Sequence, residues 1–260
     1  MTGILTKWHL MAVVLIGGLL ACGSSSSVSS SEPSGDEQVT ITVFAAASLE
    51  KSFTAISHDV EATTPGLTVN LNLAGSQSLV DQLINGARAD ILATANQSTM
   101  DKAVQANLVT APRTFTTNVL TLVTPAGNPA GITGLDSSMN GKNLVVCAPQ
   151  VPCGSATVEL TALLGVSLAP VSEEQSVTDV MNKVRSGEAD AGIVYRTDAI
   201  SAGDEVEVIE INRANDVVNT YPIALVADSS HSDTAQIFID AVLSPEGQQR
   251  LAEYGFGAQP

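Results

Sequence analysis

Strand-like and helix-like patterns alternate along almost the whole of this 260-residue chain. In the first example, polar Thr40 and Thr42 alternate with apolar Ile41 and Val43, and from Leu49 the apolar residues recur at helical spacing. The same patterns predict strands over residues 68–73, 89–93, 119–123, 144–147, 191–195, 206–211 and 221–226, and helices over 78–85, 100–106, 156–164, 176–187, 233–242 and 245–254. Such alternation is typical of an α/β fold with largely parallel central strands.

The first 21 residues have the features of an export leader. Lys7 marks a short basic segment, and the apolar run from Leu10 to Leu20 is too short for a comfortable membrane span. The run ends in Leu19-Leu20-Ala21-Cys22-Gly23, which resembles a bacterial lipobox, where the cysteine is acylated and becomes the first mature residue. We therefore predict a signal peptide over 1–21 and a lipid anchor on Cys22. The alternatives are an ordinary cleaved signal peptide and an uncleaved anchor.

Composition changes abruptly after the leader. Residues 22–37 are rich in Ser, Gly, Pro and acidic residues, which cannot bury a core, so we predict a flexible tether before a folded part that runs from Gln38 to Pro260. Without Lys7, the 11 basic residues become 10 against 27 acidic ones, a formal charge of −17. This acidity excludes nucleic-acid binding, which needs a basic face. It also repels small anions at long range, so an anion site would have to use local dipoles.

Two cysteines remain once Cys22 is assigned to the lipid. Cys147 and Cys153 lie six residues apart, and in an exported protein a disulfide between them is the default expectation. A pair of buried free thiols is the alternative. The spacing fits neither a Cys-x-x-Cys redox pair nor a zinc framework, and we predict no site for a free metal cation.

One unit occurs once in each half of the chain. Ser76 opens a predicted helix that ends near Gly86, and Asp90 then leads into a strand. In the second half, Ser176 and Asp190 occupy the same places around another helix and strand. Two lobes of similar architecture would explain this echo, and chance similarity of common units is the alternative. The two aspartates are interpreted as structural supports rather than ligands.

Hydroxyl residues stand near the predicted starts of four helices, each just after a strand or loop. These residues are Ser48, Ser76, Ser155 and Ser176. Helix starts offer free N–H groups and a positive half-dipole, which suit an anion. In open α/β sheets, ligands bind beyond the carboxyl ends of the strands, where these helices begin. The alternative is that the serines only cap their helices.

The segments around these positions resemble a known family. They are Phe44–Leu49, Ala74–Ser76, Val151–Gly154, Gln175–Val180 and Gly192–Ala199. In this order and spacing, over essentially the whole mature domain, they are similar to the loops of the molybdate-binding proteins of ABC importers, in the acylated form of Gram-positive and actinobacterial cells. That family usually has Ala where this chain has Cys153.

The resemblance implies a type II periplasmic-binding-protein fold. It would have two α/β lobes, one formed by residues 38–117 and 222–260 and the other by 118–221, joined by two crossover strands with a ligand cleft between them. The resemblance also assigns roles to individual residues. Ser48 and Ser76 would give hydroxyl and backbone N–H groups to the anion. Cys153 and Val177 would give backbone N–H groups, and Tyr195 its phenol O–H.

The function that follows is the extracytoplasmic capture of molybdate, and also tungstate, by a monomer that delivers it to a membrane permease, with no cofactor and no catalysis. The alternative is the same fold binding sulfate, another oxyanion or a small organic anion. An adhesin or structural lipoprotein is a further possibility. An esterase is disfavoured because the mature chain has only His58 and His231 as potential bases, and Ser48 lies in no Gly-x-Ser-x-Gly elbow.

Overall fold

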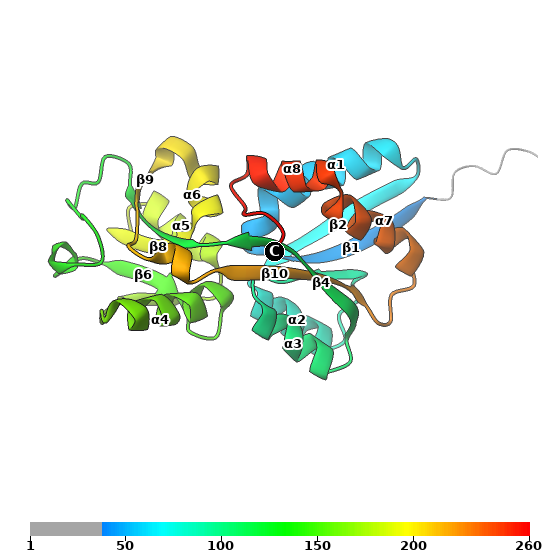
Figure 1. Cartoon of the computed structure of the whole chain (residues 1–260), viewed down its shortest axis with the longest axis horizontal. Coiled ribbons are helices and arrows are strands. Elements are labelled where there is room, and N and C mark those ends of the chain that lie inside the picture. Colours follow the sequence, from blue (N-terminus) through cyan, green and yellow to red (C-terminus); the bar gives the residue numbers. More distant parts are fainter. Residues whose placement is uncertain (1–37) are drawn as a thin grey trace, which may run out of the picture. The chain divides into compact units, whose positions relative to one another are not determined.

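The computed structural model of the protein describes residues 38–260. The predicted signal peptide, the lipid anchor at Cys22 and the tether over 22–37 lie outside the described residues. The described part contains two five-stranded mixed sheets, each covered by helices on both faces (Figure 1). The fold class predicted from the sequence, α/β with two lobes, is therefore confirmed.

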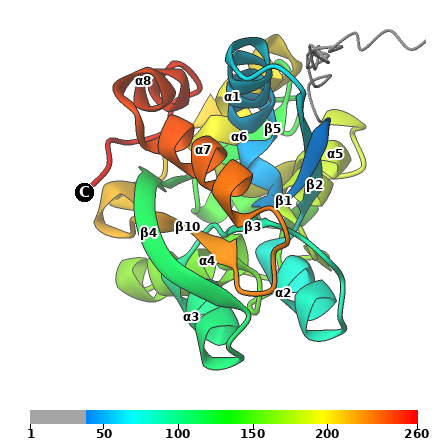
Figure 2. The ribbon, with the colours of Figure 1, turned by 90° about the vertical axis from the view of Figure 1, so that its right-hand side faces the viewer.

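The first sheet has the strand order β2-β1-β3-β10-β4. Its strands are β1 (Val39–Ala46), β2 (Leu67–Ala74), β3 (Ile91–Ala93), β4 (Val109–Asn118) and β10 (Asn219–Val226). The helices α1 (Glu50–Thr63), α7 (Ser232–Leu243) and α8 (Pro245–Glu253) lie on one face, and α2 (Ser76–Ile84) and α3 (Gln97–Gln105) on the other (Figure 2).

The second sheet repeats this plan with the order β7-β6-β8-β5-β9. Its strands are β5 (Leu120–Pro125), β6 (Leu144–Cys147), β7 (Ser172–Glu174), β8 (Ala191–Tyr195) and β9 (Val206–Ile209). In Figure 1, α4 (Pro152–Leu164) covers one face, and α5 (Val177–Arg185) and α6 (Arg196–Ala202) cover the other. Short 3-10 turns are η1 (Ala47–Leu49), η2 (Ser137–Met139), η3 (Gly203–Glu205) and η4 (Ala214–Asp216).

Alternating side chains of the first sheet fill two separate layers of core. On the face towards α1, the Phe53 ring lies 5.7 Å from the ring of Phe115 and 5.5 Å from that of Phe238. Such aromatic pairs add about 0.5–1.5 kcal/mol beyond the area they bury. On the other face, Phe44 belongs to a second buried cluster with Leu79 of α2. The continuous apolar run from Val43 to Ala46 in β1, all of it buried, is typical of a strand with core on both faces.

In each sheet four of the five strands run in the same direction, which agrees with the prediction of largely parallel strands. In the first sheet β1 runs parallel to β2 and β3, but β10 runs antiparallel to β3 and β4. In the second sheet β6 runs parallel to β7 and β8, but β5 runs antiparallel to β8 and β9. Parallel pairing needs a crossover on the same sheet. The reversed strands, β10 in the first sheet and β5 in the second, each lie directly after a passage of the chain from one sheet to the other.

The two sheets are joined at two places. Only Val119 separates β4 from β5, and residues 210–218 lead from β9 back to β10. Strand β10 pairs with β4 as far as Asn219, which lies opposite Asn118. The first sheet therefore includes Asn118 and residues 219–221, which the sequence assigns to lobe 2. The lobe boundaries predicted at 118 and 222 differ from the sheets by one and three residues.

The helix–strand unit that occurs twice in the sequence also occurs twice in the structure. Asp90, just before β3, accepts a hydrogen bond of 2.7 Å from the backbone N–H of Thr42 in the neighbouring β1. Asp190, just before β8, accepts one of the same length from Asn143, which precedes the neighbouring β6. Both carboxylates therefore tie two parallel strands together, which confirms their interpretation as structural supports.

Two features of the described residues bear on function classes. No helix between residues 38 and 260 is long and apolar enough to cross a membrane. In the same residues, no group of three or more His, Cys, Asp or Glu side chains is arranged to hold a metal ion.

Candidate functional site

The five residues predicted to contact a ligand lie around one small cavity. Ser48 and Ser76 come from the first sheet's side, and Cys153, Val177 and Tyr195 come from the second. The cavity measures about 10 Å³, close to the lower limit for holding a single water molecule. Four of the five residues are buried and both sheets contribute walls, so we expect a ligand to enter as the lobes separate.

Three helices begin at this cavity. Ser76 is the first residue of α2, Cys153 the second of α4, and Val177 the first of α5. The first N–H groups of a helix have no acceptor within the helix and carry its positive half-dipole. Their convergence gives the cavity a positive potential without any cation. None of the residues that line this cavity, all within the described part of the chain, carries a charge.

Most of the serines thought to cap helices do something else. Ser48 lies inside the η1 turn, and its hydroxyl is 3.0 Å from that of Tyr221. Ser155 lies inside α4, which begins four residues before its predicted start because Pro152 suits a first helical position. Of the four serines, only Ser176 is an N-cap, and it accepts a hydrogen bond from the N–H of Asp179. The hydroxyls of Ser48 and Ser76 are thus not used for capping.

The Ser76 hydroxyl has a fixed donor behind it. Its oxygen accepts a hydrogen bond of 3.0 Å from the backbone N–H of Ala95. A serine hydroxyl has one hydrogen to donate. With its oxygen engaged by Ala95, Ser76 keeps that hydrogen for an acceptor in the cavity.

Tyr195 is supported in the same way by Asn219. The Asn219 side-chain nitrogen donates to the carbonyl of Ala95 and to the Tyr195 hydroxyl, both at 3.0 Å. Because the Ala95 carbonyl can only accept, it determines which end of the amide is the NH₂ group. Burial, together with the nearby Tyr221 and Asp198, holds the pKa of Tyr195 well above its usual value. Tyr195 therefore remains a neutral donor.

A second amide orients Ser48 through Tyr221. The Asn118 side-chain oxygen accepts from the backbone N–H of Val119, so its nitrogen donates to Thr197 at 2.8 Å and to the Tyr221 hydroxyl at 3.3 Å. Burial raises the pKa of Tyr221 well above its usual value, so its hydroxyl is also a neutral donor. Either hydroxyl can donate in the Ser48–Tyr221 bond, and when Tyr221 donates, the Ser48 hydrogen is left for the cavity.

The arrangement is therefore a site of hydrogen-bond donors. The hydroxyls of Ser76 and Tyr195 accept a hydrogen bond from a group fixed in the fold, and the Ser48 hydroxyl can accept one from Tyr221, so each of the three can donate inward. The backbone N–H groups of the three helix starts can only donate. A fully deprotonated oxyanion satisfies such a set, whereas a ligand that carries its own proton leaves that proton without an acceptor.

The loop before α4 is cross-linked. A disulfide joins Cys147, the last residue of β6, to Cys153, and the two Cα atoms lie 5.7 Å apart. Gly154 is needed next to it, because a Cβ atom there would lie 1.9 Å from the carbonyl oxygen of Ala148. The strand end, the loop and the first turn of α4 are thus held together directly under the N–H group predicted to face the ligand.

A second cavity, of about 70 Å³, lies beside the first and also between the lobes. It is lined by Ser48 and by the charged side chains of Glu50, Lys51, Arg185 and Asp198. Burial raises the pKa of Asp198 to about 7, against the lowering effect of hydrogen bonds from backbone N–H groups. Because Asp198 is only half-buried, solvent in this cavity offsets part of that rise.

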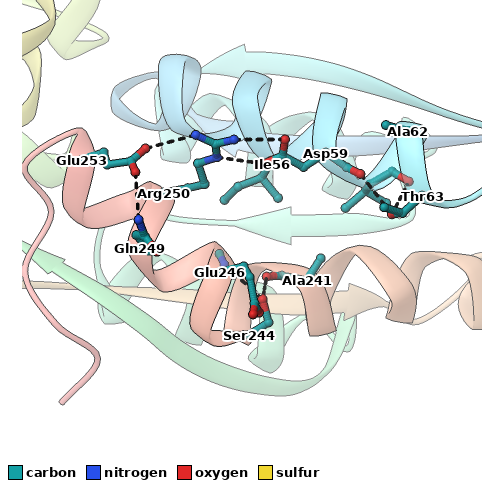
Figure 3. Close-up of a pocket in the computed structure, with 12 residues that line it drawn as sticks. Ile56, Asp59, Ala62, Thr63, Ala241, Ser244, Glu246, Gln249, Arg250 and Glu253 are labelled. Atoms are coloured by element: carbon teal, nitrogen blue, oxygen red, sulfur yellow. Dashed lines mark hydrogen bonds and ion pairs between the residues drawn. The ribbon is translucent and has the colours of Figure 1, made fainter.

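A larger groove lies elsewhere and has no comparable chemistry. It measures about 580 Å³ and runs between α1 and α8 (Figure 3). Arg250 crosses it to Asp59 at 2.8 Å and pairs with Glu253 at 3.2 Å. These side chains are exposed, and such ion pairs are worth little. The size of a cavity therefore does not locate the site in this molecule.

Three supporting residues were not predicted from the sequence. Asn118, Asn219 and Tyr221 are buried at the ends of β4 and β10, and none of them lines the small cavity. The sequence does place an Asn beside two of the predicted apolar strands, at positions 118 and 219. Asparagine is also common in turns at such positions, so its presence there does not by itself indicate a buried supporting role.

Comparison with known proteins identifies the family. Residues 41–257 match the family model described as bacterial extracellular solute-binding protein. The chain belongs to this family. Its members are ligand-capturing, extracytoplasmic components of transport systems rather than enzymes.

Several relatives of this solute-binding protein carry names that state the ligand they bind. The molybdate-binding protein ModA of Mycobacterium tuberculosis is 44% identical over 251 residues, which is 95% of each chain. The molybdate-binding protein ModA of Escherichia coli is 31% identical and covers 83% of this chain and 88% of its own. The periplasmic molybdate-binding protein of Azotobacter vinelandii superposes with a TM-score of 0.74 over 85% of this chain and 100% of its own. At 17% identity, that last match supports the fold alone.

Proposed function

We propose that this solute-binding protein captures molybdate, and also tungstate, outside the cytoplasmic membrane. The observation that carries the proposal is the orientation of three hydroxyls, those of Ser48, Ser76 and Tyr195. Ser76 and Tyr195 accept from fixed N–H donors and Ser48 can accept from Tyr221, an arrangement that leaves all three hydrogens for the cavity. Relatives that are named for molybdate binding, at up to 44% identity, support the same ligand.

The donor set selects against phosphate. Near neutral pH, phosphate keeps a proton that needs an acceptor, and the oriented hydroxyls and helix N–H groups are donors. A buried polar group left without its partner costs about 1–3 kcal/mol, so the protonated anion binds poorly. Sulfate has the same charge as molybdate, and it must be distinguished by its smaller size.

The cavity also limits the class of ligand. Pockets that take drug-sized organic molecules measure about 300–1,000 Å³, whereas the cavity at the three helix starts measures about 10 Å³. A cavity this small argues against a drug-sized organic anion as the ligand. Closing of the two lobes over the bound oxyanion would be the signal read by the transporter.

A ligand captured outside the membrane must be passed to a transporter in it. The protein would act as a monomer, tied to the membrane through a lipid on Cys22, and would deliver its ligand to an ABC permease. It would carry out no reaction and need no cofactor or cation. His58 is exposed and outside the small cavity, which gives Ser48 no positioned base there.

A thermal-shift panel tests the ligand. The protein is melted with sodium molybdate, tungstate, sulfate or phosphate at equal ionic strength, with sodium chloride as the control. A ligand present at 100 times its dissociation constant stabilises the folded state by about 2.7 kcal/mol. We expect a clear upward shift of the melting temperature with molybdate and tungstate, and little change with phosphate. Phosphate binding as tight as molybdate binding would refute the donor-only account, and a shift with sulfate alone would reassign the ligand.

A further inference from the structure

The backbone conformation at position 75 does not require the glycine that stands there. It is the N-cap of α2, with φ −57° and ψ 134°, a conformation open to any residue. Gly86, at the other end of the same helix, differs because its φ of +87° favours glycine. The reason for a glycine at position 75 must therefore lie in what surrounds it.

The neighbour is the backbone of the other lobe. A Cβ atom at position 75 would lie 2.1 Å from the carbonyl oxygen of Gln175 and 3.3 Å from its carbonyl carbon. Gln175 directly precedes Ser176, the N-cap of α5. The obstacle is thus main chain at the start of a helix, which cannot rotate aside as a flexible side chain can.

Two hydrogen bonds between the lobes involve long or flexible side chains, which can adjust. Asn96 reaches Ser155 through a side-chain bond of 3.4 Å, and the Lys51 ammonium reaches the carbonyl of Ser201 at 3.3 Å. Long side chains can keep such contacts over a range of lobe separations. The contact between Gly75 and Gln175 has no such freedom, because main chain meets main chain.

We propose that Gly75 sets how far the two lobes close, and thereby holds the ligand donors of both lobes at binding distance. This inference rests on the proposed oxyanion-binding function. Gly75 adjoins Ser76 in the first lobe, and Gln175 lies two residues before Val177 in the second, so both sides of the contact carry predicted donors. Gly75 is a positioning residue in this account.

The size of the effect follows from the distances. A methyl group at position 75 needs about 1 Å more room to reach an ordinary van der Waals separation from the Gln175 oxygen. A hydrogen bond of ordinary length loses most of its strength when it is stretched by that much. Losing one charge-assisted hydrogen bond weakens binding by roughly tenfold or more. Each lobe keeps its own fold, because the backbone angles at position 75 suit alanine.

The first arm of the test compares Gly75→Ala with Gly134→Ala in the full chain. Gly134 is the matched control, since a Cβ atom there meets only the side chain of Asp136, at 3.3 Å. Without ligand, both variants should melt at or slightly above the wild-type temperature, because alanine restricts the unfolded chain. In titration calorimetry with molybdate, G75A should bind at least about tenfold more weakly than wild type, and G134A should match wild type. Equal affinity of G75A and wild type would overturn the proposal.

The second arm measures closure without ligand. Asn96→Cys and Ser155→Cys are introduced together, a short bifunctional maleimide is added, and the linked 96–155 peptides are quantified by mass spectrometry. Adding G75A should slow this cross-link, whereas adding G134A should not. An unchanged rate with G75A would refute the closure limit. If the wild-type protein binds no oxyanion, the proposed function fails, and the cross-linking rates still decide the role of Gly75.

Discussion

Replacing Tyr195 by Phe removes a single hydroxyl from the candidate site and leaves the ring. The Tyr195 ring is buried and packs edge-on against Tyr221 at 5.9 Å, a contact that phenylalanine retains. Asn219 loses one acceptor but keeps the carbonyl of Ala95 at 3.0 Å. We therefore expect the free energy of unfolding without ligand to fall by only about 1 kcal/mol, the net worth of an ordinary hydrogen bond.

The loss of ligand affinity should be larger. A hydrogen bond to a charged group is worth about 1.5–3 kcal/mol. Its loss should raise the dissociation constant for molybdate roughly 10- to 150-fold. Titration calorimetry with molybdate measures this constant, and urea unfolding without ligand measures the change in stability. Tyr254→Phe is the control, because Tyr254 lies at the end of α8 and does not line the small cavity. A dissociation constant for Y195F within twofold of wild type would show that the Tyr195 hydroxyl does not reach the anion.

Two further predictions concern the disulfide and the buried acid. Replacing Cys147 and Cys153 together by Ser should lower the free energy of unfolding by about 2 kcal/mol and weaken molybdate binding; unchanged melting and affinity would contradict the role of the cross-link. Because the pKa of Asp198 rises from 3.8 to about 7 on folding, the folded protein binds the extra proton, and stability should fall as pH rises through that interval. Asp198→Asn should therefore melt a few degrees higher than wild type at pH 8, and the difference should shrink as the pH is lowered through 5 towards 4. An equal difference at pH 8 and pH 5, or none at either, would contradict the raised pKa.

The elements that carry the site were predictable because they combine two strong local signals. Ser76 and Val177 stand where a strand or loop pattern gives way to a helix, Tyr195 ends a predicted strand, and the structure places all three at the cavity. Period-two and helical patterns reflect burial, so they survive in a single sequence. The roles of these residues came from the family resemblance, because the same pattern also describes an ordinary capped helix.

Elements without a buried stripe were missed. Strand β4 forms an edge of the first sheet, and most of its first six residues are exposed, with Pro112 among them. An edge strand tolerates proline and needs no alternating apolar face, so no pattern marked it. Helix α6 has only seven residues, of which Thr197, Ala199 and Ala202 are buried. Small and polar buried residues give too weak a period to predict a helix.

The position of the supporting amides links the donors to the junction between the lobes. Asn118 and Asn219 face each other in the register of β4 and β10, the strands beside both chain passages. Asn219 bonds to Ala95 in one lobe and Tyr195 in the other, and Asn118 bonds to Tyr221 and Thr197 in the same divided way. Residues at a junction move least when two bodies rotate about it. We therefore expect the two amides to keep the hydroxyl oxygens of Tyr195 and Tyr221 engaged while the lobes are apart. These hydroxyls would then be oriented before an anion arrives, which lowers the entropy lost on binding.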